Sequence, residues 1–321
     1  MKIYRRLRVW VLVLAGLASS TAPRSSEAQL FRPSTTQPVS IEVLDVGQGD
    51  SILIRSPEGK TALIDAGPTR NAALAALKRK GIKSLDLVAI SHHHGDHYGG
   101  MDAVVRALKP RYFLASSSGH ATTLYLKLLK TVEAEGLTVI QPTSKPRKIE
   151  LGSVELTLFP QPPEDRKDEN NNSIGLRVTY RSFSVLLTGD SEGPERQWWL
   201  LNHPELVRGC TILKLPHHGS RNGTDARWLQ AVGPQLAVAS MGKNNEYGHP
   251  HSETIGLLRR SGIPLLRTDQ LGTIAITSDG RDWQVAQPAL TRRGRPTQAD
   301  IDRIAASEEV STMRSSVSRS R

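Results

Sequence analysis

The sequence predicts an α/β protein, and three observations support this fold class. Short apolar stretches typical of buried strands alternate with stretches of helical period along residues 41–286. Three of the apolar stretches, 85–90, 183–187 and 212–215, are each followed within a few residues by histidine or aspartate. Ligand and metal sites in α/β proteins favour the carboxyl ends of strands. The same pattern therefore predicts both the fold class and the place of a functional site.

The predicted elements follow one another along the whole of this region. Two strands flank the glycine-rich turn of 41–54, and proline or glycine punctuates several of the helix ends, as at Pro194 and Gly81. Further strands are expected at 61–65, 85–90, 111–115, 137–141, 154–159, 174–180, 183–190, 211–215, 235–240, 264–267, 272–277 and 282–286. Helices are expected at 71–80, 101–108, 122–135, 194–202 and 252–261.

Composition and charge describe a globular domain with polar ends. The chain has 321 residues, of which 38% are hydrophobic, and its single cysteine, Cys210, excludes an internal disulfide. Of the formal charge of +11, residues 1–28 carry +4 and residues 291–321 carry +3, which leaves about +4 between them. A core this mildly basic permits a polyanionic substrate but does not demand one.

Residues 1–28 are predicted to be a signal peptide. A basic start, an apolar run over 9–18 and small residues before Gln29 predict cleavage near Ala28-Gln29. The apolar run is shorter than the roughly 20 residues that span a bilayer, so we expect a secreted or periplasmic protein without stable membrane insertion after cleavage. An uncleaved anchor is the alternative. We expect a linker at 29–40, one domain at 41–288 and a basic disordered tail at 289–321.

Four histidines and an aspartate lie within six positions after the strand at 85–90. In an extended segment alternate side chains share a face, so His92 and His94 point together and His93 points away. If the chain turns at Gly95, Asp96 and His97 face the same space from the other side. Imidazole and carboxylate suit zinc, manganese or iron. Two such pairs predict two metal positions in one cavity.

The motif His92-x-His94-x-Asp96-His97 resembles the H-x-H-x-D-H signature of the metallo-β-lactamase-fold hydrolases. The resemblance implies a four-layer αββα sandwich with metals at one edge of its two packed sheets. The segments D-V-G-Q-G-D-S, L-I-D-A-G and K-x-x-H-H-G-S resemble the metallo-β-lactamase-like domain of ComEC, the DNA-uptake protein of competent bacteria. Together the matching segments cover about residues 41–286.

The resemblance implies a set of metal ligands. His92 and His94 would hold one metal, Asp96, His97 and His217 the other, and Asp190 of the T-G-D segment would bridge both. The sequence favours His217 over His218, which would orient substrate or hold the turn. Asp65 is expected to hydrogen-bond the metal loop, and Asp96 to orient water as well.

The Asn-rich segment at 169–173 departs from the family pattern, because many members place a third histidine ligand there. A carbonyl of Asn170 or Asn172, or a water, could complete the first metal position, or the segment could be only a turn. Two divalent metals are expected, zinc first, with manganese as the competitor that amide ligands favour.

Two further residues are expected near the substrate. His249, in a segment resembling N-x-Y-G-H-P, is a candidate for phosphate contact or for protonation of the leaving group, or it could only hydrogen-bond its loop. Ser220 could donate to an anion.

The function implied is a metal-dependent hydrolase that cleaves a small-molecule or nucleic-acid phosphodiester through a hydroxide activated by both metals. An esterase, lactonase or β-lactamase on the same fold is the alternative, as is a binding protein that keeps its metals without turnover. The absence of cysteine from every proposed ligand position favours an open catalytic site over a structural one.

Overall fold

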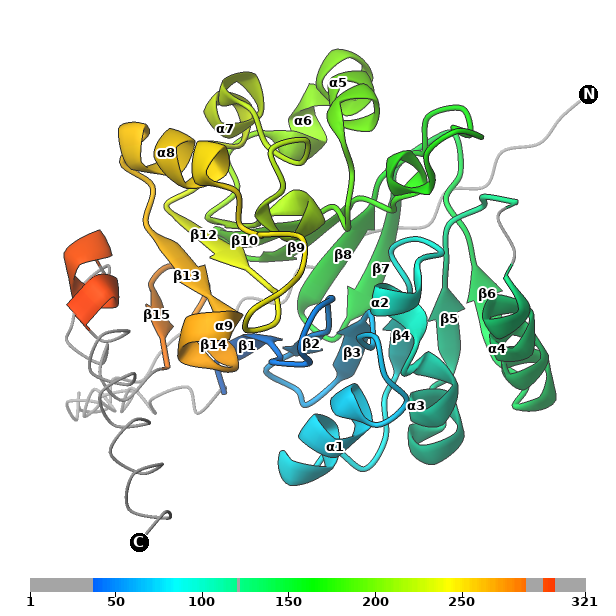
Figure 1. Cartoon of the computed structure of the whole chain (residues 1–321). Coiled ribbons are helices and arrows are strands. Elements are labelled where there is room, and N and C mark those ends of the chain that lie inside the picture. The colour runs from blue at the N-terminus through cyan, green and yellow to red at the C-terminus, as the bar shows by residue number, and fades with distance from the viewer. Residues whose placement is uncertain (1–36, 120–121, 287–296, 304–321) are drawn as a thin grey trace, which may run out of the picture. The chain divides into compact units, whose positions relative to one another are not determined.

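The computed structural model describes residues 37–119, 122–286 and 297–303 (Figure 1). The predicted signal peptide lies outside these residues, as does the linker up to residue 36. In the described chain, the first strand begins at Val39, two residues before the expected start of the domain at residue 41. Predicted helix ends at 71–80, 122–135 and 252–261 differ from the observed ones by at most one residue.

Two mixed sheets form the centre of the molecule. The first is eight-stranded, with strands in the spatial order β15 (Trp283–Val285), β14 (Ile274–Ser278), β1 (Val39–Val43), β2 (Ile52–Arg55), β3 (Thr61–Ile64), β4 (Leu87–Ala89), β5 (Tyr112–Leu114) and β6 (Thr138–Ile140). The second is seven-stranded, in the order β13 (Leu265–Arg267), β12 (Leu236–Ala239), β11 (Ile212–Lys214), β10 (Phe183–Leu187), β9 (Leu176–Tyr180), β8 (Val154–Leu158) and β7 (Arg147–Leu151).

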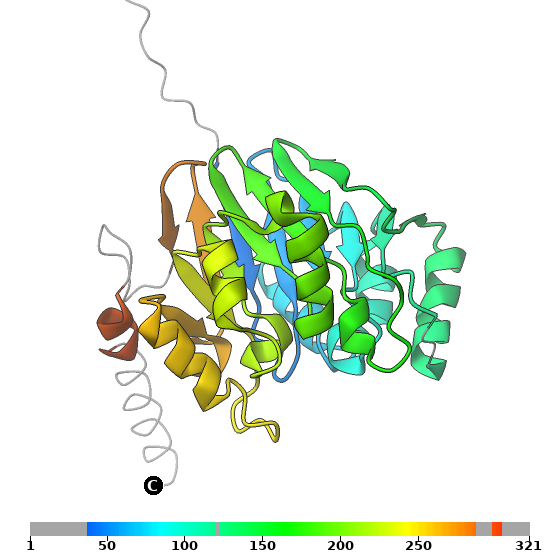
Figure 2. The same ribbon diagram turned by 90° about the horizontal axis from the view of Figure 1, so that it is seen from above.

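Helices cover the outer face of each sheet (Figures 1 and 2). The first sheet packs against α1 (Ala72–Arg79), α3 (Met101–Leu108) and α4 (Thr123–Ala134), and the short α2 (Gly95–Tyr98) precedes α3. The second packs against α5 (Gly193–Asn202), α6 (Pro204–Val207), α7 (Ala226–Val232) and α8 (Ser252–Arg260). The short α9 (Thr268–Leu271) and two 3₁₀ turns, η1 (Glu169–Asn172) and η2 (Pro216–Gly219), complete the helices of the described residues. The predicted αββα sandwich is confirmed.

Both faces of each sheet are buried, one against the other sheet and one against helices. Successive side chains along a strand therefore point alternately into the inner and the outer core. Ile52 and Ile54 of β2 join the core between the sheets, whereas Leu53 faces the helices of the first layer. In β10, Val185 points to the inner core and Leu186 to the outer helices. Near-continuous apolar strands of this kind can be recognised from sequence because both faces need apolar side chains.

Strand β7 is an element that the sequence did not predict. Its residues Arg147 and Lys148 are exposed, and β7 pairs only with β8, so it forms the edge of its sheet. Charged residues on an edge strand discourage pairing with other chains. They also interrupt the apolar pattern by which a strand is recognised in the sequence, so β7 was not predicted.

The described part of the predicted tail is ordered rather than disordered. Residues 298–303 are helical, and Ile301 is 1% exposed and belongs to the core between the sheets. The side chain of Gln298 accepts a hydrogen bond from the Leu265 N–H at 2.9 Å, on the edge strand β13. One buried isoleucine and this bond hold a segment whose composition alone suggested disorder.

No helix among the described residues is both long and apolar enough to cross a bilayer.

Candidate metal centre

Parallel strands carry the site. Strands β3, β4 and β5 run parallel in the first sheet, and β10, β11 and β12 run parallel in the second. The loops after β4, β10 and β11 hold the predicted ligands, and the loop after β12 holds His249. The two sheets therefore bring together side chains that lie more than a hundred residues apart in sequence.

The loop after β4 has the alternation that its sequence predicts. His92 Nε2 lies 3.0 Å from His94 Nδ1, so these two rings share a face, and we call them the histidine pair. His93 points elsewhere: its ring stacks on Tyr125 at 4.0 Å between centroids, and its Nδ1 lies 3.4 Å from the Glu169 carboxylate. His93 is therefore placed to support the loop from behind rather than to bind a metal with its neighbours.

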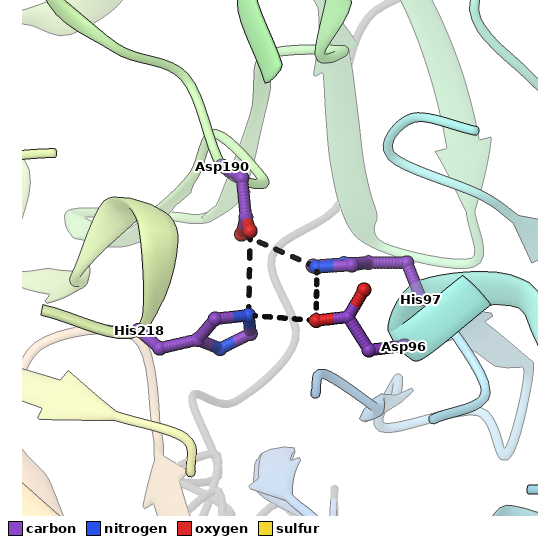
Figure 3. A group of neighbouring side chains, drawn as sticks. All are labelled: Asp96, His97, Asp190 and His218. Carbon is purple, nitrogen blue, oxygen red and sulfur yellow. Dashed lines mark ion pairs between the residues drawn. The ribbon is translucent and has the colours of Figure 1, made fainter. Parts of the chain in front are cut away.

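Four side chains converge beside this loop, and we call them the carboxylate–histidine cluster: Asp96, His97, Asp190 and His218 (Figure 3). His218 Nε2 lies 3.3 Å from an oxygen of Asp96 and 3.3 Å from an oxygen of Asp190. His97 Nε2 lies 3.3 Å from the other oxygen of Asp190 and 3.7 Å from Asp96. One ligand atom from each residue lies within 4.8 Å of all the others.

The chemistry of the cluster fits a divalent cation. Among the described residues, His97 Nε2, His218 Nε2 and Asp190 Oδ1 are buried and have no hydrogen-bond partner. A buried polar atom without a partner destabilises the fold, and a bound metal ion would supply the missing interaction. Two imidazole nitrogens and two carboxylates form a donor set that suits zinc or manganese. The residues present therefore fit a metal.

The charges in the cluster depend on one another. Burial by itself would lower the pKa of His97 and of His218, but Asp190 and the other nearby carboxylates outweigh it and raise both pKa values well above the usual 6.5. Burial likewise favours the neutral form of Asp190, yet the two histidines hold its pKa well below its usual range. A divalent cation between these atoms would replace the imidazolium protons that balance the carboxylates.

The structure places His218, rather than His217, in this cluster. Both residues have left-handed backbone angles, φ 49° and 53°, so the chain turns sharply directly after β11. His218 faces inward at 1% exposure of its side chain, whereas His217 lies at the rim with its Nδ1 3.0 Å from Glu192 and its Nε2 3.9 Å from Asp190. The position after a strand does not reveal such a turn, so the sequence, which favoured His217 as the ligand, did not show that His218 is the residue that faces inward.

Buried carboxylates lie behind both cluster histidines. Asp65 accepts a hydrogen bond from the Ser91 N–H at 2.7 Å, and its other oxygen lies 2.8 Å from His97 Nδ1. This is the contact expected between Asp65 and the metal loop, and it would orient the imidazole toward a metal. Asp50 lies 3.4 Å from His218 Nδ1, which is also 2.8 Å from the Ser240 carbonyl oxygen.

Asp50 and Lys214 form an ion pair that sequence reasoning missed. Both side chains are 1% exposed and in contact with each other. The signal was present, because Asp50 lies in D-V-G-Q-G-D-S and Lys214 opens K-x-x-H-H-G-S. Both segments helped to identify the family resemblance. Neither of them shows by itself that Asp50 and Lys214 form a pair.

The Asn-rich segment contacts the loop after β4 through Glu169, and the amide group of Asn172 is hydrogen-bonded to Asp165 and Glu169. Asn172 Oδ1 accepts a hydrogen bond from the Asp165 N–H at 2.8 Å, and Asn172 Nδ2 donates to Glu169 at 3.0 Å. Glu169 also accepts from the His93 N–H at 3.1 Å. The side chain of Asn172 is thus committed to its loop, which disfavours it as a ligand, whereas Asn170 Oδ1 is buried and has no hydrogen-bond partner among the described residues.

His249 lies beside the cluster, at 6.1 Å between its ring centroid and that of His218. Burial, followed by the nearby charges of His218 and His217, lowers the pKa of His249 to about 4. The protonated form that an acid role requires is therefore scarce at neutral pH, which argues against that half of the expectation. Ser220 is buried, and its Oγ accepts from the Asn222 N–H at 3.3 Å.

The comparisons with known proteins agree with this geometry. The model of the family described as "Metallo-beta-lactamase superfamily" matches residues 44–243. The chain is 28% identical to ComE operon protein 3 of Bacillus subtilis over 75% of its own length and 33% of that protein. It is 29% identical to competence protein ComA of Neisseria gonorrhoeae, over 84% of the chain and 35% of the relative. The chain thus spans about a third of the length of these relatives.

A solved structure supports the fold. The metallo-β-lactamase fold protein YhfI from Bacillus subtilis matches with a TM-score of 0.50 at 14% identity, over 72% of this chain and 96% of that one. The resemblance to the metallo-β-lactamase-like domain of ComEC that the sequence motifs indicate is confirmed by the family match together with the two competence relatives.

Proposed function

We propose that this chain, which belongs to the metallo-β-lactamase superfamily and is a metal-dependent hydrolase of that superfamily, cleaves phosphodiester bonds, with nucleic acid as the substrate class. The carboxylate–histidine cluster is the observation that carries the proposal, because four ligand-type side chains converge there and, in the described chain, three of their buried atoms, His97 Nε2, His218 Nε2 and Asp190 Oδ1, have no hydrogen-bond partner. The competence relatives favour nucleic acid over other hydrolase substrates.

The cluster would hold one divalent metal, and the histidine pair would contribute to a second position, with Asp190 between them. Zinc is the metal that the donor set favours first, and manganese is the alternative. When bound, such metals lower the pKa of water and polarise a phosphoryl oxygen.

The chain's own residues would orient the reactants. The side chain of Asp96 is 31% exposed, which leaves it able to accept a hydrogen bond from a water at the site. Asp65 fixes the ring of His97, and Lys214 neutralises Asp50 behind His218. His249 presents a neutral ring, with a buried Nδ1 that has no hydrogen-bond partner in the described chain, and would contact the substrate rather than protonate it.

We also propose that the protein acts outside the cytoplasm, on the basis of the predicted signal peptide at 1–28. Mass spectrometry of exported protein should find a mature N-terminus near Gln29. Intact Met1 on exported protein would contradict the cleavage.

A substrate panel tests the proposed activity. Purified protein loaded with zinc or with manganese is assayed against bis(p-nitrophenyl) phosphate, a single-stranded oligonucleotide, p-nitrophenyl acetate and a chromogenic β-lactam. We expect turnover of the two phosphodiesters that is lost in His218→Ala and kept in the control His203→Ala, which alters a histidine outside the site. Turnover of the ester or the lactam alone would replace the proposal with that activity.

A further inference from the structure

The loop between β12 and α8 carries an exposed aromatic side chain. Tyr247 is 63% exposed, and it is the one aromatic ring among the large hydrophobic side chains that are exposed in the described residues. The exposed residues before it on the loop are the cationic Lys243, the polar Asn244 and the acidic Glu246. Single exposed apolar groups are common on proteins. A role in binding is therefore inferred from the position of this ring and not from its exposure.

Tyr247 lies at the end of a stack of rings that leads to the cluster. Its ring lies 5.6 Å from that of His249, with 21° between the planes. The ring of His249 in turn lies 6.1 Å from that of His218, at 27°. Two nearly parallel stacking steps therefore separate the exposed phenol from a residue of the candidate metal centre.

The loop is held in place by its own hydrogen bonds. Asn245 Nδ2 donates to the His249 carbonyl at 2.8 Å and to the Gly242 carbonyl at 3.2 Å, and Asn245 Oδ1 accepts from the His249 N–H at 2.8 Å. A ring on a loop held in this way needs little ordering when a ligand arrives, so its contact contributes more of its energy to binding.

A nucleic-acid phosphodiester fits this arrangement. In a polynucleotide the base is joined to its phosphate through one sugar, so a phosphate at the metal centre places a flat aromatic group close by. Every base has a π face, and stacking on an exposed aromatic side chain binds single strands without sequence preference. Lys243, on the same loop, offers a cation for the backbone on either side.

We propose that Tyr247 is a stacking platform for a base of single-stranded nucleic acid whose phosphodiester lies at the carboxylate–histidine cluster. This inference rests on the proposed function and names the part of the substrate that the site would recognise besides the phosphate.

Binding of two matched strands tests the platform. The full-length, metal-loaded protein is titrated into a fluorescent single-stranded oligothymidylate and into a strand of equal length that lacks bases, both with phosphorothioate linkages that resist cleavage. Wild type should bind the strand with bases about 5–150-fold more tightly, the range that corresponds to about 1–3 kcal/mol of stacking. Tyr247→Ala should abolish this difference, whereas Tyr247→Phe should keep it.

Leu201→Ala is the matched control, because Leu201 is 69% exposed and lies in α5, outside the loop; it should bind both strands as wild type does. Equal binding of the two strands by wild type overturns the platform, as does an equal loss on both strands in Tyr247→Ala. Hydrolysis of bis(p-nitrophenyl) phosphate is measured on the same preparations. Preference for bases without hydrolysis rejects only the proposed activity, and hydrolysis without preference rejects only the platform.

Discussion

The two halves of the candidate metal centre are built differently. The carboxylate–histidine cluster takes Asp96 and His97 from the first sheet and Asp190 and His218 from the second, and buried groups lie behind both of its histidines. The histidine pair comes from one loop, and the amide of Asn172 in the Asn-rich segment is already engaged elsewhere. We expect from this difference one tightly held metal at the cluster and one more weakly held at the pair.

The largest expected effect on metal content comes from removing the carboxylate that both halves share. Asp190 faces both His97 and His218, and its charge also acts on His92. Asp190→Asn should therefore lose both metals and all turnover, as measured by elemental analysis after dialysis. His203→Ala is the control and should keep both. Retention of one full equivalent by Asp190→Asn would mean that the halves do not share this residue.

The next largest effect separates His218 from its neighbour. His218→Ala removes a cluster ligand and should weaken the tight metal by more than about 100-fold, since loss of an outer contact alone costs about 10–100-fold. His217→Ala should leave that affinity nearly unchanged, because His217 lies at the rim. Competition with a chromogenic chelator measures both variants. The reverse ranking would restore the assignment that the sequence favoured.

The pair itself is tested by His92→Ala. Its ring contributes to the second position only, so metal content should fall from two equivalents to one while the tight affinity stays. Isothermal titration of the metal-free protein should show two phases for wild type and one for the variant. Simultaneous loss of both phases would show a single cooperative site instead of two unequal ones.

The contact behind His97 should have a smaller effect. Asp65→Asn keeps the shape of the side chain but removes the charge 2.8 Å from His97 Nδ1. We expect about 10–100-fold weaker binding of the tight metal. Asp86→Asn, which alters a partly exposed carboxylate paired with Lys60, is a control outside the site. Equal affinities of the Asp65 variant and wild type would leave Asp65 with only its bond to the Ser91 N–H.

The last effect is on stability rather than on metal binding, and it concerns Glu195, a fully buried residue that lies near the Asn-rich segment. Burial raises its pKa well above the usual 4.5; the Ser173 N–H partly offsets this, and repulsion from Glu169 adds to it. A carboxyl whose pKa is raised by folding stabilises the fold fully below pH 4.5, and that contribution is lost as pH rises through the folded value.

Glu195→Gln should therefore match wild type near pH 4 and exceed it at neutral pH by up to about 3 kcal/mol, because each pH unit above the unfolded pKa costs wild type about 1.4 kcal/mol until the folded pKa is reached. Urea unfolding at the two pH values measures this difference. A variant less stable than wild type at neutral pH would show that the ionised carboxylate is needed there.

The sequence by itself determined the fold class and the edge of the sheets at which the candidate site lies. Apolar strands followed by His92, by Asp190 and by the His217–His218 pair mark that edge, because ligand-type residues that repeatedly follow buried strands indicate a site there. The motifs identified the superfamily, which the family match confirms. The alternation of His92, His93 and His94 was also predictable, because it follows from extended backbone alone.

Only the tertiary structure decided which neighbouring residue faces the site and which charges balance. The left-handed backbone angles of His217 and His218, directly after β11, turn the His218 side chain inward and the His217 side chain outward. Histidine adopts such angles only rarely, so the sequence does not predict them. Asp50 and Lys214 lie 164 positions apart, so their pairing depends on two sheets packing face to face. Ile301 is buried for the same reason. Local pattern specifies strands and motifs, whereas the packing of the sheets decides the direction and partners of each side chain.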